Sequence, residues 1–179
     1  ATLPNRVTLS SNGTNAAQET TPATTSIETQ IAGTADPANG ADGLLTGAGD
    51  FMASKDAGTL FDVRTLTLTV SGPQSLGETI QLTGSTGGSG EDAFVIDTRG
   101  LPTGSVIQLD HIEFAAIVGT ATVTGGAGQN YAVGDGSDQN ISLGALDDTL
   151  IGGAGDDTIG SAFGEDILYG NQGNDAING

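Results

Sequence analysis

The residues with the clearest chemical potential are four aspartates, nine residues apart, near the end of the 179-residue chain: Asp148, Asp157, Asp166 and Asp175. The chain has 22 acidic and 4 basic residues, and its last eighty residues contain neither Lys nor Arg. Carboxylates clustered without basic partners repel one another unless metal ions bind. The pattern therefore indicates either a metal-binding segment or an acidic surface suited to solubility or high salt.

A nine-residue period predicts the elements that position these aspartates. From Gly125 the chain divides into six units, which begin at residues 125, 134, 143, 152, 161 and 170. Early glycines in the units permit sharp turns, and a three-residue strand then carries one apolar side chain inward. Such a short period predicts a solenoid, in which each unit buries its apolar residue against its neighbours. The apolar residues occupy the eighth positions: Ala132, Ile141, Leu150, Ile159, Leu168 and Ile177.

The unit GGAGDDTIG at 152–160 resembles the nonapeptide of the RTX (repeats-in-toxin, hemolysin-type) calcium-binding family. The resemblance is strongest over 143–179 and weaker back to 125. It implies a parallel β-roll in which two nonapeptides make one turn, so that Asp148 faces Asp166 and Asp157 faces Asp175. It also implies Ca²⁺ as the cofactor, held by carboxylates and backbone carbonyl oxygens. The implied metal-site residues are Asp148, Asp157, Asp166, Asp175, Gly152, Gly153, Ala154, Gly155, Gly164, Gly170 and Gly173.

Two units depart from this pattern, because Asn130 and Gln139 replace the aspartate at the sixth position. We expect calcium to be weak or absent there, and the two amides to bridge turns by hydrogen bonds and cap the roll. Asp138, one residue early, would restore a site only if the turn shifted register. The fifth-position acids are expected to point to solvent: Asp147, Asp156 and Glu165.

A second match to the nonapeptide, GGSGEDAFV, lies upstream at residues 87–95. Asp92 occupies the metal-binding position of this unit, but residues 96–104 break the nine-residue period. Two interpretations stay open: Asp92 belongs to a calcium site, or the unit is an ordinary glycine-rich turn before a strand.

The predicted fold class is all-β, with almost no helix. Residues 1–60 form a Thr/Gly-rich region that is extended or β, residues 61–124 a β-rich region leading into the solenoid, and residues 125–179 the β-roll. Within the first region, 20–30 is rich in Thr and is either a linker, an O-glycosylated stretch or an exposed β-edge. Residues 41–50 have the composition of a turn.

The sequence offers no recognisable catalytic arrangement, so we expect no enzyme activity. His111 is the single histidine, and the flanking Asp110 and Glu113 are interpreted as a solvent-facing polar edge. A formal net charge of −18 argues against nucleic acid as a partner, since phosphate binding needs Lys and Arg. No apolar run approaches the roughly 18 residues needed to cross a bilayer.

The resemblance implies a secreted, extracellular protein of the bacterial cell surface, such as a surface-layer protein or adhesin, exported by type I secretion. Calcium is scarce inside the cell, so the roll would fold only outside, where calcium binding contributes to folding. The alternatives are the non-catalytic tail of a secreted lipase, protease or epimerase, and a fragment of an RTX toxin. The open end of a roll also favours a homo-oligomer or surface assembly.

Overall fold

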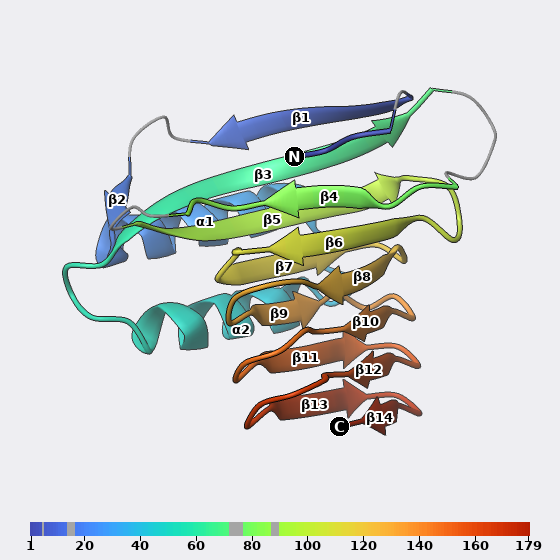
Figure 1. Ribbon diagram of the computed structural model, residues 1–179. Coiled ribbons are helices and arrows are strands. Elements are labelled where there is room, and N and C mark those ends of the chain that lie inside the picture. Colours follow the sequence, from blue (N-terminus) through green and yellow to red (C-terminus); the bar gives the residue numbers. More distant parts are fainter. Residues whose placement is uncertain (5, 14–16, 72–76, 87–89) are drawn as a thin grey trace.

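The computed structural model describes residues 1–4, 6–13, 17–71, 77–86 and 90–179. Two sheets stack face to face, and from β3 onward successive strands alternate between them (Figure 1). The larger sheet has the order β1-β3-β5-β7-β9-β11-β13, with β2 also paired to β3, and the smaller has the order β14-β12-β10-β8-β6-β4. Pairings that involve β1 and β2 are antiparallel, and the pairings between later strands are parallel.

The strands from β6 onward have at most six residues each, whereas β3 and β5 have eleven. The larger sheet contains β1 (Val7–Gly13), β2 (Gln18–Glu19), β3 (Leu60–Val70), β5 (Gly90–Gly100), β7 (Phe114–Val118), β9 (Tyr131–Gly134), β11 (Thr149–Ala154) and β13 (Ile167–Gln172). The smaller contains β4 (Ile80–Thr83), β6 (Val106–Asp110), β8 (Thr122–Gly125), β10 (Asn140–Ser142), β12 (Thr158–Gly160) and β14 (Ala176–Asn178).

The strand register of the C-terminal half repeats every eighteen residues. Tyr131 pairs with Thr149 and Thr149 with Ile167 in the larger sheet. One strand from each sheet, with its two turns, therefore forms one eighteen-residue coil, which is consistent with the expected parallel β-roll. The earlier strands β3 to β8 extend the same two sheets upstream, so the stack does not begin at residue 125.

Two helices cover the outer face of the larger sheet, and the expectation of almost no helix is wrong. They are α1 (Thr20–Thr34) and α2 (Ala41–Ala53). Residues 20–30 are thus neither a linker nor a β-edge, residues 41–50 are not a turn, and the region 1–60 is only partly extended or β. In α1 the buried residues Ala23, Ile27 and Ile31 recur every four residues and pack on the sheet, which gives the Thr-rich segment its helical face.

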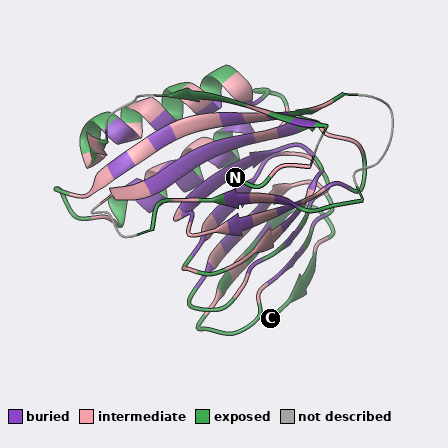
Figure 2. Cartoon of the chain, turned by 45° about the horizontal axis from the view of Figure 1, so that its top comes forward, coloured by how far each residue is buried: buried purple, intermediate pink, exposed green. Residues whose placement is uncertain are grey.

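The stack has two hydrophobic cores, separated by the larger sheet. β7 is buried on both faces: Ala115 and Ile117 belong to the core between the sheets, whereas Phe114 belongs to the core beneath the helices. The helices contact β3, β5, β7, β9 and β11. Burial is densest in the upper strands and decreases towards the last coil (Figure 2). No helix in the described part of the chain is long and apolar enough to cross a membrane.

We predict that Phe114→Ala lowers the free energy of unfolding by about 3–5 kcal/mol, because it leaves a cavity between the helices and the sheet. Phe114 is fully buried, and its ring packs 5.0 Å from that of Phe51 and 5.9 Å from that of Tyr131, centroid to centroid. Urea denaturation in saturating calcium measures the change. The control is Glu28→Ala, since Glu28 is exposed on α1 and the substitution should change stability by less than about 0.5 kcal/mol. Equal effects of the two substitutions would contradict this packing.

Candidate metal centre

The sixth-position aspartates form two ladders, one at each end of the short strands. Asp148 and Asp166 precede β11 and β13, and Asp157 and Asp175 precede β12 and β14. The backbone N–H of Asp148 donates to Asp166 Oδ1 at 3.0 Å, and that of Asp157 donates to Asp175 Oδ1 at 3.0 Å. The structure therefore brings together both pairs that the eighteen-residue spacing predicts.

In each ladder the aspartate that comes earlier in the sequence is buried without a cationic partner. Asp148 and Asp157 are each 1% exposed. Asp157 Oδ1 accepts a hydrogen bond from the backbone N–H of Gln139 at 2.8 Å, but Asp157 Oδ2 has no hydrogen-bond partner. Buried polar atoms are nearly always paired, and a buried carboxylate without a counter-charge is costly. The free oxygen therefore indicates a position for a cation.

Burial also changes the acidity of these aspartates. The pKa of Asp157 is raised to about 6, chiefly by burial; the backbone N–H of Gln139 opposes this shift, and the negative charge of Asp175 contributes to it. The pKa of Asp148 is raised by burial and by the charge of Asp166, and lowered in part by the N–H of Asn130. Both carboxylates are thus held in surroundings that disfavour their charge when no metal is bound.

Glycines make room for these carboxylates and direct carbonyl oxygens towards them. A Cβ on Gly152 would lie 2.5 Å from Asp157 Oδ2 and 3.0 Å from the carbonyl oxygen of Gly170. A carboxylate oxygen and a carbonyl oxygen thus approach one point that no side chain occupies. A Cβ on Gly170 would likewise lie 2.2 Å from Asp175 Oδ2.

The turns themselves require glycine at several of the predicted positions. The φ of Gly155 is +105°, which side chains with a Cβ rarely adopt. Ala154 instead donates its N–H to the carbonyl oxygen of Asp135 at 3.0 Å, so it links adjacent coils through its backbone. The predicted turn glycines that share a positive φ are Gly153, Gly155, Gly164 and Gly173.

This donor set suits calcium. Ca²⁺ takes 6–8 oxygen ligands, including carboxylates and backbone carbonyls. No group of three His, Cys, Asp or Glu side chains within the described ranges could hold a metal by itself, so backbone oxygens must complete the shell. A family model described as RTX calcium-binding nonapeptide repeat, with four copies, matches residues 133–168 and 142–177.

The C-terminal coils are RTX repeats. RTX nonapeptide repeats bind Ca²⁺, and the proteins that contain them are typically secreted. The match covers the coils from β9 to β14 and leaves the helices and β1 to β8 outside it. Neither the curated proteins nor the solved structures contain a match to this chain.

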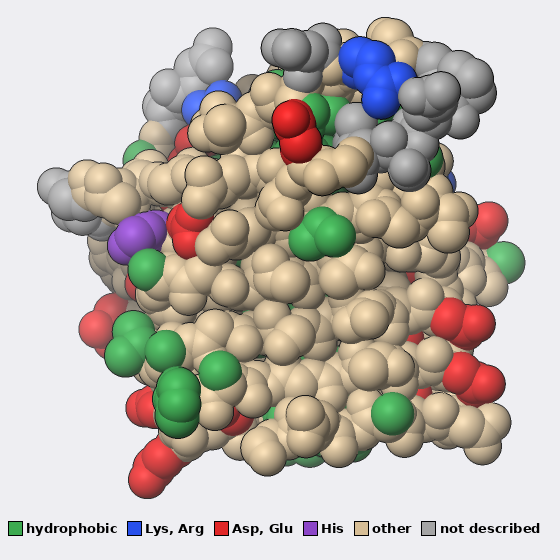
Figure 3. Space-filling view, turned by 45° about the vertical axis from the view of Figure 1, so that its right-hand side comes forward, with side chains coloured by type: hydrophobic (Ala, Val, Ile, Leu, Met, Phe, Trp, Pro, Cys, Tyr) green, Lys and Arg blue, Asp and Glu red, His purple; other side chains and the backbone are tan. Residues whose placement is uncertain are grey.

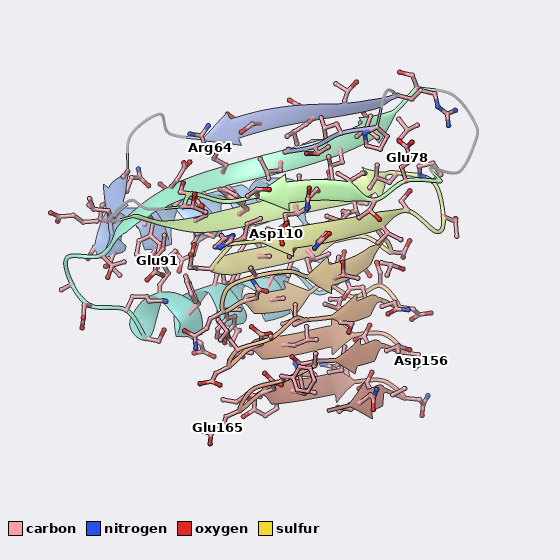
Figure 4. All side chains as sticks on the ribbon, in the orientation of Figure 1. Arg64, Glu78, Glu91, Asp110, Asp156 and Glu165 are labelled. Carbon is pink, nitrogen blue, oxygen red and sulfur yellow. The ribbon has the colours of Figure 1, made fainter. Side chains whose placement is uncertain are left out.

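The fifth-position acids of the RTX coils form a second, outer set of contacts. Asp147, Asp156 and Glu165 are exposed, as expected, and Figure 4 shows Asp156 and Glu165 at opposite ends of the strands. Asp147 Oδ1 also accepts the backbone N–H of Glu165, and Asp156 Oδ1 that of Asn174, each at 2.9 Å. Acidic side chains therefore line the two edges of the lower stack, whereas basic ones gather near the top (Figure 3).

The amides that replace aspartate bridge adjacent turns, as the sequence suggested, but they do not cap the roll, because both sheets continue upstream of them. Asn130 Nδ2 donates to the carbonyl oxygen of Ile112 at 2.7 Å, and Gln139 Nε2 donates to that of Gly119 at 3.3 Å. Asp138 does not replace Gln139, because Asp138 is exposed and the register between β10 and β12 is unbroken.

Asp92 lies on an upstream continuation of the ladder that contains Asp148. It is 2% exposed at the start of β5, and its carboxylate accepts the backbone N–H of Ser85. The N–H of Asp92 donates to Glu113 Oε2 at 2.8 Å, the same contact that joins Asp148 to Asp166. Residues 87–89 of the upstream match lie outside the described residues.

Glu113 is a member of this ladder that sequence analysis missed. Paired residues of β5 and β7 are 21 residues apart rather than 18, so the repeat gave no signal for it. The polar residues around His111 also do more than face solvent. Asp110 Oδ2 accepts the side-chain amide of Gln81 at 2.9 Å, so Asp110 and Glu113 each bind a neighbouring strand.

We predict that calcium affinity rises between about pH 5 and pH 7, because calcium must displace the proton from Asp157, whose pKa is about 6. Without metal the sign is opposite. The folded pKa exceeds the usual value of 3.8, so the folded coil binds more protons, and the fraction of these coils that is ordered in EGTA rises as pH falls from about 6 to 4. Calorimetric titration with calcium and far-UV circular dichroism in EGTA at several pH values measure the two trends. A calcium affinity equal at pH 5 and pH 7 would refute this assignment.

Proposed function

We propose that this chain is a non-enzymatic, calcium-dependent structural segment of a secreted bacterial cell-surface protein, of the surface-layer or adhesin type. The observation that carries the proposal is the pair of carboxylate ladders in the C-terminal coils. These coils contain no basic residue, since Arg99 is the last one in the sequence. Calcium neutralises the repulsion within the ladders, and its binding free energy contributes directly to folding. The segment is therefore unfolded in its last coils where calcium is scarce and ordered outside the cell.

The distribution of apolar contacts supports calcium dependence of the last coils in particular. The strands β3, β5 and β7 of the larger sheet lie between two cores, and the core beneath the helices includes Phe61 and Phe114. The last coil has only two inward aliphatic residues, and Leu168 is partly buried while Ile177 is 53% exposed. Burial of one aliphatic side chain contributes about 1.5–3 kcal/mol. This free energy offsets the entropy cost of ordering roughly two backbone residues, whereas each repeat unit has nine residues to order. Metal binding supplies the interaction that these coils otherwise lack.

A structural rather than catalytic role is supported by the contacts of the polar residues near His111. Asp110 and Glu113 are the acids that flank the single histidine, and each already accepts a hydrogen bond from a neighbouring strand. Both acids therefore hold coils together, as the carboxylates of the RTX repeats do.

We predict that removing calcium with EGTA reduces the β-sheet signal in far-UV circular dichroism and that added Ca²⁺ restores it. Asp157→Asn should raise the calcium concentration at the midpoint by at least about tenfold, since even indirect partners of a metal site change affinity by about 10–100-fold. Asp156→Asn is the matched control, because it removes the same charge from an exposed neighbour and should leave the midpoint nearly unchanged. Identical spectra in EGTA and calcium at low salt would exclude the proposed function.

We also propose that calcium-loaded chains associate through the apolar side chains of the last two coils, in keeping with a surface assembly. Five large apolar side chains are exposed there: Leu146, Phe163, Ile167, Tyr169 and Ile177. Ala145 pairs with Phe163, so Leu146 and Phe163 lie on adjacent coils, and neighbouring exposed apolar side chains commonly mark an interaction site.

We predict that light scattering shows a mass increase in calcium but not in EGTA, where a net charge of −18 keeps chains apart. Phe163→Ser should reduce the association, because Phe163 is 80% exposed. A monomer at high protein concentration in calcium would show that this assembly does not occur.

A further inference from the structure

The coil that begins at Gly134 contains a buried amide whose oxygen has no hydrogen-bond partner. Gln139 is 3% exposed, and its Oε1 is unpaired, whereas its Nε2 donates to Asp135 Oδ1 at 2.7 Å and to the carbonyl oxygen of Gly119 at 3.3 Å. The amide therefore satisfies its donor side fully and leaves its acceptor side free.

The orientation of this amide is determined by its neighbours. If Oε1 and Nε2 exchanged places, Oε1 would face the carboxylate of Asp135 and the carbonyl oxygen of Gly119, neither of which can donate a hydrogen bond to it. The observed orientation is thus the one that the network requires, and it directs the amide oxygen away from Asp135.

The free oxygen points at a second oxygen. A Cβ on Gly134 would lie 1.7 Å from Gln139 Oε1 and 2.1 Å from the carbonyl oxygen of Gly152, so both oxygens converge on one point that only a glycine leaves open. Eighteen residues later, Asp157 Oδ2 and the carbonyl oxygen of Gly170 converge at Gly152 in the same way. Gln139 therefore repeats, with an amide, the arrangement that the RTX coil below it makes with a carboxylate.

The negative charge that Gln139 lacks is supplied by Asp135. This residue occupies the second position of its unit, where the repeat has glycine, and it is 1% exposed. Its carboxylate accepts hydrogen bonds from the N–H groups of Gly119 and Ser137, each at 3.0 Å, in addition to the Gln139 amide. A carboxylate that accepts a hydrogen bond from the NH₂ group increases the negative charge on the amide oxygen. Groups that hydrogen-bond to metal ligands commonly strengthen the ligand in this way.

We propose that Gln139 Oε1 and the carbonyl oxygen of Gly152 bind an additional Ca²⁺, with Asp135 as the positioning residue behind the amide. Amide and carbonyl oxygens are hard ligands that calcium accepts. This site departs from the expectation that calcium binding is weak or absent where Gln139 replaces aspartate. It rests on the proposed function, since it extends a calcium ladder by one coil.

The site also joins the RTX coils to the helical layer. Asn39, in the loop between α1 and α2, donates from Nδ2 to Asp135 Oδ2 at 3.3 Å and to Ser137 Oγ at 3.2 Å. The N–H of Gly136 donates in turn to the carbonyl oxygen of Asn39 at 3.0 Å. Calcium at Gln139 therefore binds at the level where the helices meet the roll.

The test counts calcium ions bound to the full chain by native mass spectrometry. Gln139→Met keeps the length of the side chain but removes its oxygen, and it should lose one ion relative to the unmodified chain. Asp135→Asn should weaken the same site by about 10–100-fold. Asp138→Asn is the control, because Asp138 is an exposed neighbour, and it should retain the full number of ions.

An unchanged ion count in folded Gln139→Met overturns the proposal. Should that variant not fold, anomalous diffraction from calcium-containing crystals of the unmodified chain decides. A calcium peak in contact with Gln139 Oε1 and the carbonyl oxygen of Gly152 supports the proposal, and peaks at Asp157 without one at Gln139 refute it. Absence of any bound calcium in the unmodified chain would instead refute the proposed function.

Discussion

The structure depends on carboxylates that are stacked at the spacing of β-strands with no basic residue to neutralise them. Adjacent coils bring Asp148 to Asp166 and Asp157 to Asp175 through direct backbone-to-carboxylate hydrogen bonds. These hydrogen bonds satisfy one oxygen of each pair but supply no positive charge, and burial, with a smaller contribution from neighbouring acids, raises the pKa of Asp157 to about 6. RTX repeats bind calcium, which would neutralise this charge, and under the proposed function its binding free energy contributes to the folding of the last coils.

The sources of stability change along the stack. Near β5 and β7, aliphatic and aromatic side chains are buried on both faces of the larger sheet, and three ion pairs involve Lys55, Arg64 and Arg99. Towards β13 and β14 the helices no longer cover the sheet, and the inward residues are few. The chain thus joins an end held by hydrophobic burial to an end with few apolar contacts, for which we propose stabilisation by calcium. Gln139 and Asp135 lie at the boundary, where an amide replaces the usual carboxylate and the helical layer is attached.

Hydrophobic periodicity did not reveal the helices, for reasons that lie in their composition. In α1, threonine suggested a strand or linker, yet three apolar residues spaced by four are enough to hold the helix on the sheet. In α2, glycines suggested a turn, but a Cβ on Gly47 would lie only 2.6 Å from a methyl carbon of Val133. That glycine allows the helix to approach β9 closely. Tertiary packing therefore outweighed the local preferences of both segments.

The sequence by itself determined the coils from residue 125 onward, since a nine-residue repeat places each aspartate, glycine and aliphatic residue at the same point of every turn. It identified the metal ladders, calcium, and the pairing of residues eighteen apart. Only the tertiary structure decided the roles of Glu113 and Asp135. Their spacing from their partners does not follow the repeat, and the contact of Glu113 with Asp92 depends on strands whose separation in the chain is irregular. The direction of the Gln139 amide likewise depends on Gly119, which reaches it only through the folding of the preceding coil.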